Sequence, residues 1–259
     1  MNLLLLEPGE LAGDTATLAD RRAAHLRAVL GVRIGSRVRA GVLGGGTGTA
    51  EVIADDGAAL TLRLALAEPA RPPLPVELVL AVPRPKVLSR TIEIAAAFGV
   101  ARIALTNAWR VDKSYLSSPR VAPEALALAA RLGAEQGATT HVPEVALHRR
   151  LMELLDGRWP APGAPPRRKL VAHPGGVPIE QALDGALAGG GPGGDPGGDP
   201  GAPIALAIGP EGGWIAREVE TFAARGFTVV SHGESILRVE AAVAAALGQL
   251  VLLRRLGRA

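Results

Sequence analysis

The chain has 259 residues, of which 48% are hydrophobic and 20% charged, and its formal net charge is +3, as in a globular protein of one or two domains. It contains no cysteine, which excludes a disulfide framework, a thiolate zinc site and a cysteine nucleophile. No uncharged apolar run reaches about 18 residues, and no basic region precedes the first apolar run, which argues against a transmembrane helix and a signal peptide. We therefore expect a cytoplasmic protein with no membrane partner.

The first 70 residues contain short β-rich segments separated by glycine and aspartate turns. Such segments are typical of a small antiparallel barrel, which we expect over residues 1–70. One helix interrupts them, with Asp20 as N-cap, Gly31 as C-cap, and Leu26, Val29 and Leu30 on its apolar face. The predicted strands lie at 3–6, 36–44, 48–55 and 59–66.

The densest basic patch of the sequence lies on this helix and just after it. One interpretation is a solvated helix face. The other is an RNA-binding surface, because the planar guanidinium of arginine binds phosphate oxygens in pairs. The predicted RNA-binding residues of the patch are Arg21, Arg22 and Arg27.

Four prolines within residues 68–77 indicate a linker between two domains. The second domain, predicted over 71–259, has a pattern of alternating strands and helices. Apolar runs of strand length, each followed by a glycine and a helical pattern, are typical of a parallel α/β sheet. An insert of glycine, proline and aspartate at about 189–202 is predicted to be a disordered loop without a ligand. The expected strands are 76–82, 101–106, 167–173, 204–208 and 227–231.

The polar loop at 106–120 carries aromatic side chains among cations. Aromatic rings can stack on bases while the charges hold phosphates, which makes Arg110 and Lys113 candidate RNA-binding residues. An ordered surface loop explains the same composition equally well.

The predicted strands at 204–208 and 227–231 both end in polar, glycine-containing loops. Ligands of parallel sheets bind at the carboxyl ends of the strands, so these two loops are expected to face one pocket. The strand at 167–173 also leads into a glycine-containing loop. His173 either lines that pocket or shapes a turn with Pro174. GPEGG at 209–213 lacks the spacing of a dinucleotide fingerprint and no GK[ST] follows it, and neither metal-ligand spacing nor a serine triad is present.

The combination of IGPEGGW with SHGESILRVEAA, preceded by a strand ending in HPG and by ALALAARLGAEQ, resembles the RsmE-type 16S ribosomal RNA uridine N3-methyltransferases of the SPOUT superfamily. The resemblance covers nearly the whole chain. It implies a PUA-like β-barrel, an α/β domain with a C-terminal trefoil knot, and a homodimer paired through the knot region. It also implies S-adenosylmethionine as cofactor and 16S rRNA or the small ribosomal subunit as partner, without a metal.

In such a knot the cofactor is held mainly by backbone groups of three loops. The implied cofactor-binding residues are Ala172, His173, Pro174, Ile208, Gly209, Pro210, Glu211, Gly212, Gly213, His232, Gly233, Ile236, Leu237 and Arg238. The chain departs from the family pattern where it has His232 to Ser235 in place of Leu-Gly-Pro-Arg, and Trp214 in place of a common phenylalanine.

Methylation of uridine N3 requires the anion of that nitrogen, whose charge spreads onto O2 and O4. Arg238 is the candidate catalytic residue, because an arginine aimed at such an oxygen stabilises the charge; alternatively it pairs with Glu240 or Glu211. Glu240, the second candidate, either orients Arg238 or favours a helix N-terminus. The alternative function is a non-catalytic SPOUT-like RNA-binding protein or ribosome assembly factor.

Overall fold

The computed structural model describes residues 2–164, 168–188 and 202–257. The chain forms two compact units: unit 1 comprises Met1–Pro73 and Arg131–Val142, and unit 2 comprises Leu74–Ala130 and Pro143–Ala259. Residues 189–201, where the sequence predicts a disordered loop, lie outside the described residues. None of the helices in the described ranges combines the length and the apolar character that a membrane span needs.

The sheet of unit 1 has six strands in the order β1-β4-β5-β6-β3-β2. β1 pairs with β4 in parallel, whereas the other pairs are antiparallel, so the expectation of a wholly antiparallel sheet is wrong at β1. The strands are β1 (Leu4–Leu6), β2 (Leu11–Ala12), β3 (Thr15–Leu18), β4 (Arg37–Val42), β5 (Thr47–Asp55) and β6 (Leu60–Glu68).

Helix α1 (Arg21–Ala28) packs Ala23 and Leu26 into the core of this sheet. The Asp20 carboxylate accepts a hydrogen bond from Arg22 N at 2.8 Å, which confirms the predicted N-cap. Val29 is 66% exposed and Leu30 49%, so placing them on the apolar face was wrong. The helix ends at Ala28, before these two residues complete another turn.

The N-terminal strand explains why residues 131–142 belong to unit 1. Successive side chains of a strand face opposite ways. Leu4 and Leu6 therefore enter the core of the sheet, while Leu3 and Leu5 bury themselves against Ala134. The unit thus reaches beyond the predicted 1–70 boundary, since the second face of its first strand is covered by the end of helix α3 (Pro123–Gly137).

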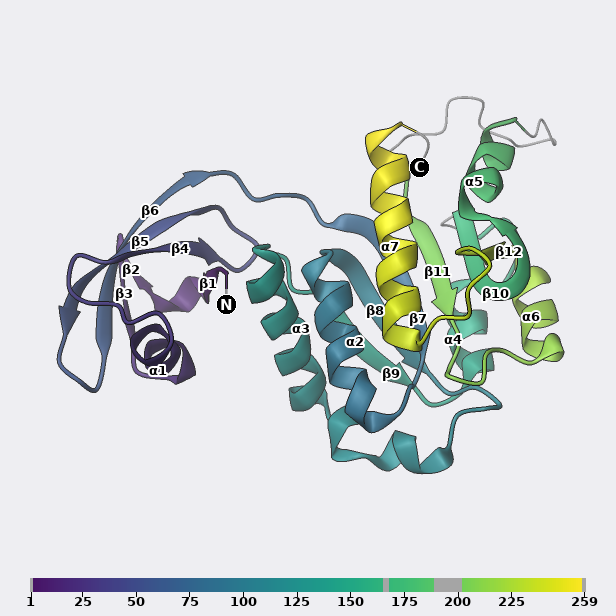
Figure 1. Cartoon of the computed structure of the whole chain (residues 1–259), viewed down its shortest axis with the longest axis horizontal. Coiled ribbons are helices and arrows are strands. Elements are labelled where there is room, and N and C mark those ends of the chain that lie inside the picture. The colour runs from purple at the N-terminus through teal and green to yellow at the C-terminus, as the bar shows by residue number, and fades with distance from the viewer. Residues whose placement is uncertain (1, 165–167, 189–201, 258–259) are drawn as a thin grey trace. The chain divides into compact units, whose positions relative to one another are not determined.

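Unit 2 contains a six-stranded, wholly parallel sheet, which confirms the predicted α/β fold (Figure 1). The strand order is β12-β10-β11-β7-β8-β9, and every residue of the central strand β11 is buried. The strands are β7 (Leu74–Ala81), β8 (Val100–Thr106), β9 (Glu144–His148), β10 (Arg168–Pro178), β11 (Ile204–Ile208) and β12 (Thr228–Ser231).

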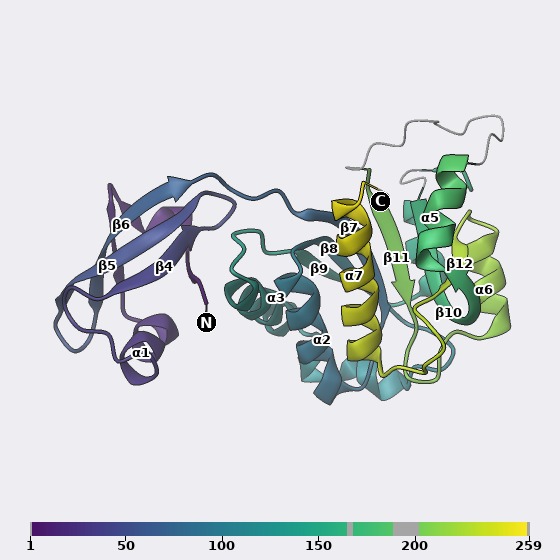
Figure 2. The same ribbon diagram turned by 45° about the horizontal axis from the view of Figure 1, so that its top comes forward.

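Helices cover this sheet and set the position of its loops. α7 (Val239–Arg255) lies beside α2 (Pro85–Ala97) and also contacts β11, as both views show (Figures 1 and 2). α6 (Ala216–Ala223) packs on β10 and β12. Apart from α3, the helices are α2 (Pro85–Ala97), α4 (Leu151–Arg158), α5 (Ile179–Ala188), α6 (Ala216–Ala223) and α7 (Val239–Arg255), and the polar loop after β8 contains two 3-10 turns, Lys113–Ser117 and Pro119–Val121.

Candidate functional site

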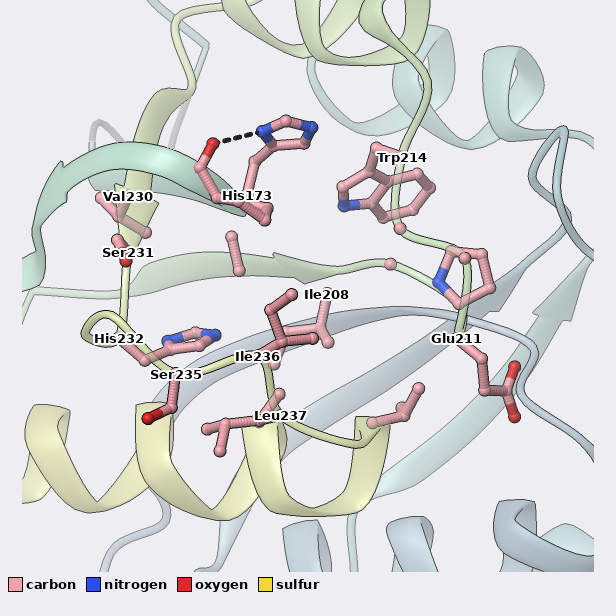
Figure 3. A pocket seen from close by; sticks show the side chains of 18 of the residues that line it. His173, Ile208, Glu211, Trp214, Val230, Ser231, His232, Ser235, Ile236 and Leu237 are labelled. Carbon is pink, nitrogen blue, oxygen red and sulfur yellow. Dashed lines mark hydrogen bonds between the residues drawn. The ribbon is translucent and has the colours of Figure 1, made fainter.

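A cavity of about 470 Å³ lies at the carboxyl ends of β11 and β12 and beside a turn within β10 (Figure 3). Its volume falls within the range of about 300–1,000 Å³ that small-molecule sites occupy. Every predicted cofactor-binding residue except Arg238 lines it, so the structure brings the three predicted loops together. The lining also includes residues that the sequence analysis did not select as cofactor-binding: Arg110, which it selected for RNA binding, and Gly175, Trp214, Val230, Ser231, Glu234, Ser235, Val239 and Ala242.

The loop after β11 forms one wall, and its glycines explain its shape. Gly213 N donates to Pro210 O at 2.7 Å, which closes a tight turn that needs the positive φ of +70° at Gly213. A Cβ on Gly212 would lie 2.9 Å from Arg110 Cδ, so a larger residue there would force the Arg110 side chain to move. Gly212 and Gly213 both line the cavity.

Arg110 and its neighbour fix the loop after β8 against this wall. The Arg110 guanidinium donates to Gly212 O, and Trp109 N donates to the Glu218 carboxylate at 2.8 Å. The same carboxylate accepts from Ile215 N at 3.0 Å, at the start of α6. Arg110 therefore borders the cavity while Trp109, 79% exposed, faces away from the protein core.

The turn within β10 forms a second wall. β10 pairs with β12 at Ala172 and again at Val177, both against Val230, so the residues between them leave the ladder. His173 Nδ1 lies 2.8 Å from Pro174 O and its side chain also lines the cavity. Both interpretations of His173 thus hold at once.

The loop after β12 forms the third wall. The Ser231 hydroxyl donates to Gly233 O at 2.7 Å, and the Gln249 amide of α7 donates to His232 O at 2.9 Å. Burial lowers the pKa of the His232 imidazole below its ordinary value, so the ring is neutral at pH 7. Ile236, in contrast, is 93% exposed at the rim.

Two polar atoms of the lining are buried without a hydrogen-bond partner anywhere in the described ranges, Trp214 Nε1 and His232 Nδ1. A buried polar group left unpaired costs about 1–3 kcal/mol. Other atoms in the described ranges, among them Glu77 Oε1 and Asn107 Oδ1, are also buried without a partner, so Trp214 Nε1 and His232 Nδ1 point to a polar ligand only in combination with the cavity that their residues line.

Arg238 and Glu240 lie at the start of α7, at the edge of this cavity. Arg238 is the exposed N-cap residue, and both its neighbours, Leu237 and Val239, line the cavity. Within residues 2–164, 168–188 and 202–257, Arg238 forms no salt bridge, so the pairing with Glu240 or Glu211 is not made. Glu240 is half-buried in the first turn of α7, where a negative charge favours the helix.

The three predicted RNA-binding arginines of unit 1 have partners within that unit. The buried Arg22 side chain donates to Leu5 O at 2.8 Å and to the carboxylates of Glu10 and Asp20, and the hydrogen bond to Glu10 raises the pKa of Arg22. Its guanidinium has no free face for a phosphate, which corrects its selection as an RNA-binding residue. Arg21 pairs with Glu135 and Arg27 with Asp55, each at 2.7 Å, yet both side chains keep part of their surface in solvent.

Among the residues that the structure describes, no three His, Asp or Glu side chains lie where they could together hold a metal ion.

Residues 70–251, which include all three walls of the cavity, match the family described as RNA methyltransferase domain. The chain belongs to this family. Over 249 residues it is 26% identical to the ribosomal RNA small subunit methyltransferase E of Treponema pallidum, covering 95% of this chain and 89% of that protein.

Solved structures show the same fold. A methyltransferase of Legionella pneumophila, in complex with the cofactor S-adenosylmethionine, superposes with a TM-score of 0.74 at 21% identity over 97% of both chains. The ribosomal RNA small subunit methyltransferase E of Neisseria gonorrhoeae, bound to S-adenosylmethionine, gives a TM-score of 0.68 at 20% identity over 97% of this chain and 98% of that one. At such identities the likeness establishes the fold of this family member.

Proposed function

We propose that this chain transfers a methyl group from S-adenosylmethionine to N3 of a uridine in 16S ribosomal RNA. The observation that carries the proposal is the meeting of three loops around one cavity in a chain of the RNA methyltransferase family. The likeness to the ribosomal RNA small subunit methyltransferase E of Treponema pallidum over 95% of the chain supports the substrate class. Ribosomal RNA as substrate implies action in the cytoplasm.

The cavity suits this cofactor chemically. Trp214 Nε1 and His232 Nδ1 are buried polar atoms for which the described ranges offer no partner, and the glycine-rich walls present backbone groups at close range. Ile208 and Leu237 add apolar surface. When bound, S-adenosylmethionine supplies an electrophilic methyl group. The protein's own contribution is to hold that group and the target nitrogen in line, which lowers the entropic part of the barrier.

Arg238 is proposed to stabilise the uridine anion. It lies at the rim of the cavity, exposed and free of a salt bridge within the described ranges, so its charge is available to an incoming base. Positioned cations act strongly where charge develops during a reaction. Glu240, two residues on, is proposed to orient Arg238 by its charge.

The RNA surface is proposed to include Arg21 and Arg27 of unit 1, taken as a PUA-like barrel, and Arg110 and Lys113 of unit 2. Arg21 and Arg27 are partly exposed, although paired. A phosphate can compete for a partly exposed guanidinium, because surface ion pairs contribute only about 0–1 kcal/mol.

A trefoil knot and a homodimer complete the proposal. β12 lies at one edge of the sheet while α7 lies beside α2, so residues 232–238 cross the carboxyl ends of β10 and β11, as threading of the chain requires. Pairing through this region is supported by apolar side chains that are exposed on the crossing loop, on α7 and at its C-cap, and at the end of β10. They are Val177, Ile236, Leu237, Leu252 and Leu256.

Two measurements test the function. Calorimetry should detect binding of S-adenosylmethionine to the folded protein, and mass spectrometry of 16S rRNA should find a 3-methyluridine that a deletion strain lacks. Folded protein that binds RNA but no S-adenosylmethionine would instead favour the non-catalytic RNA-binding or ribosome assembly role.

A further inference from the structure

Trp214 carries a hydrogen-bond donor that the protein itself does not use. The side chain is 2% exposed, and its Nε1 is buried with no acceptor among the residues that the structure describes. In Figure 3 the ring nitrogen lies on the side that faces Ile208 and His173, toward the interior of the cavity. An indole N–H only donates, so it selects a molecule with an acceptor atom.

Packing alone does not explain the nitrogen. The Trp214 ring meets Phe222 edge-on, with ring centroids 5.0 Å apart, and Phe222 meets Phe227 in the same way at 4.9 Å. A phenylalanine at position 214 would keep an aromatic contact with Phe222 and would bury no polar atom. The indole is therefore the costlier choice for the isolated protein, unless a ligand satisfies it.

We infer that the Trp214 indole donates a hydrogen bond to an acceptor atom of the bound cofactor and is a binding residue of this cavity. The identity of the ligand as S-adenosylmethionine rests on the proposed function. The ligand offers a carboxylate on its amino-acid part and ring nitrogens and hydroxyls on its nucleoside part. The backbone walls hold the molecule, and Trp214 adds a side-chain contact to one acceptor.

The test compares calorimetric affinities of the wild type, Trp214→Phe and the matched control Trp159→Phe. Trp159 is also buried, at 1% exposure, and meets Phe227 edge-on, but it does not line the cavity. Trp214→Phe should bind S-adenosylmethionine roughly three- to tenfold more weakly, as expected for one net hydrogen bond, and more weakly still if the acceptor is charged. Trp159→Phe should bind as the wild type does.

Nuclear magnetic resonance of the wild type tests the inference without relying on a variant's folding. The chain has 3 tryptophans, so the indole region holds few signals, and the one missing from Trp214→Phe belongs to Trp214. Its proton should move downfield and exchange more slowly with water when S-adenosylmethionine is added. The signals of Trp109 and Trp159 should move less.

Methylthioadenosine, which lacks the amino-acid part, locates the acceptor. A loss of affinity confined to S-adenosylmethionine places it on that part, and an equal loss for both places it on the nucleoside; either result supports the inference. Wild-type affinity in Trp214→Phe, or an indole signal that does not move, overturns it. Absence of S-adenosylmethionine binding to the wild type is a different result, because it overturns the proposed function as well.

Discussion

Unit 1 and the cavity of unit 2 use their polar groups in opposite ways. In unit 1 the arginines that stand out in the sequence are neutralised within the fold, and Arg22 is buried among Leu5 O, Glu10 and Asp20. Around the cavity, Trp214 Nε1 and His232 Nδ1 have no partner within the described ranges. A high local charge in the sequence therefore does not by itself mark a binding site.

The largest effect that this contrast predicts is at the rim of the cavity. Arg238→Ala should reduce the methylation rate about 10²–10³-fold, the decrease typical of removing one group that stabilises developing charge, while S-adenosylmethionine still binds. Single-turnover methylation of 16S rRNA measures the rate. Arg217→Ala, which removes another exposed arginine of unit 2, serves as the control. Full activity in Arg238→Ala would remove this residue from the mechanism.

The next effect tests whether Arg22 is structural. Arg22→Ala should lower the free energy of unfolding by about 3 kcal/mol, near the lower end for a broken buried pair, because Glu10 and Asp20 remain partly exposed. Urea denaturation measures it. Arg27→Ala, at a paired but more exposed position, should destabilise the protein much less, because surface ion pairs are screened by solvent. Equal destabilisation of the two variants would contradict the assignment of Arg22 to the core.

A smaller effect, on the salt dependence of RNA binding, tells whether Arg21 and Arg27 form an RNA-binding surface or a solvated helix face. Removing the charges of Arg21 and Arg27 should flatten the dependence of RNA binding on salt, by a slope of roughly 0.7–0.9 for each phosphate that the variant no longer neutralises. Binding titrations at several salt concentrations give the slope. A slope identical to that of the wild type would show that both arginines serve only their ion pairs with Glu135 and Asp55.

Much of the fold was predictable because the chain's local signals agree with its tertiary structure. The run Ile204–Ile208 is apolar throughout because β11 is buried on both faces, and Asp20 caps its helix as its position predicts. The N-terminal strand shows the limit. Its four leucines reveal burial, but not that Leu3 and Leu5 would be covered by residues more than a hundred positions later.

The residues of the cavity were likewise only partly predictable from the sequence. Glycines of the three loops were predictable, because they are needed where turns follow strands. Trp214 was visible in the sequence only as a departure from the family pattern, and its unpaired nitrogen depends on what surrounds it in space. Arg22 is the opposite case, a residue that the sequence analysis selected for binding but that the structure buries. An arginine on a short helix is expected to face solvent, and only the folded structure shows that Glu10 and Leu5 surround it.

The smallest expected effect concerns His232, whose pKa in the folded protein is lowered by burial. The unfolded chain then binds more protons between that lowered pKa and the ordinary value of about 6.5. The stability contributed by the neutral ring is complete above pH 6.5 and is lost as the pH falls through the folded pKa. His232→Asn removes the titration, so the free energy of unfolding should fall less steeply from pH 7 to pH 5 in the variant. Urea denaturation of both proteins at each pH isolates the histidine, since their carboxylates titrate alike, and parallel pH profiles would show that the His232 imidazole is not held neutral by the wall of the cavity.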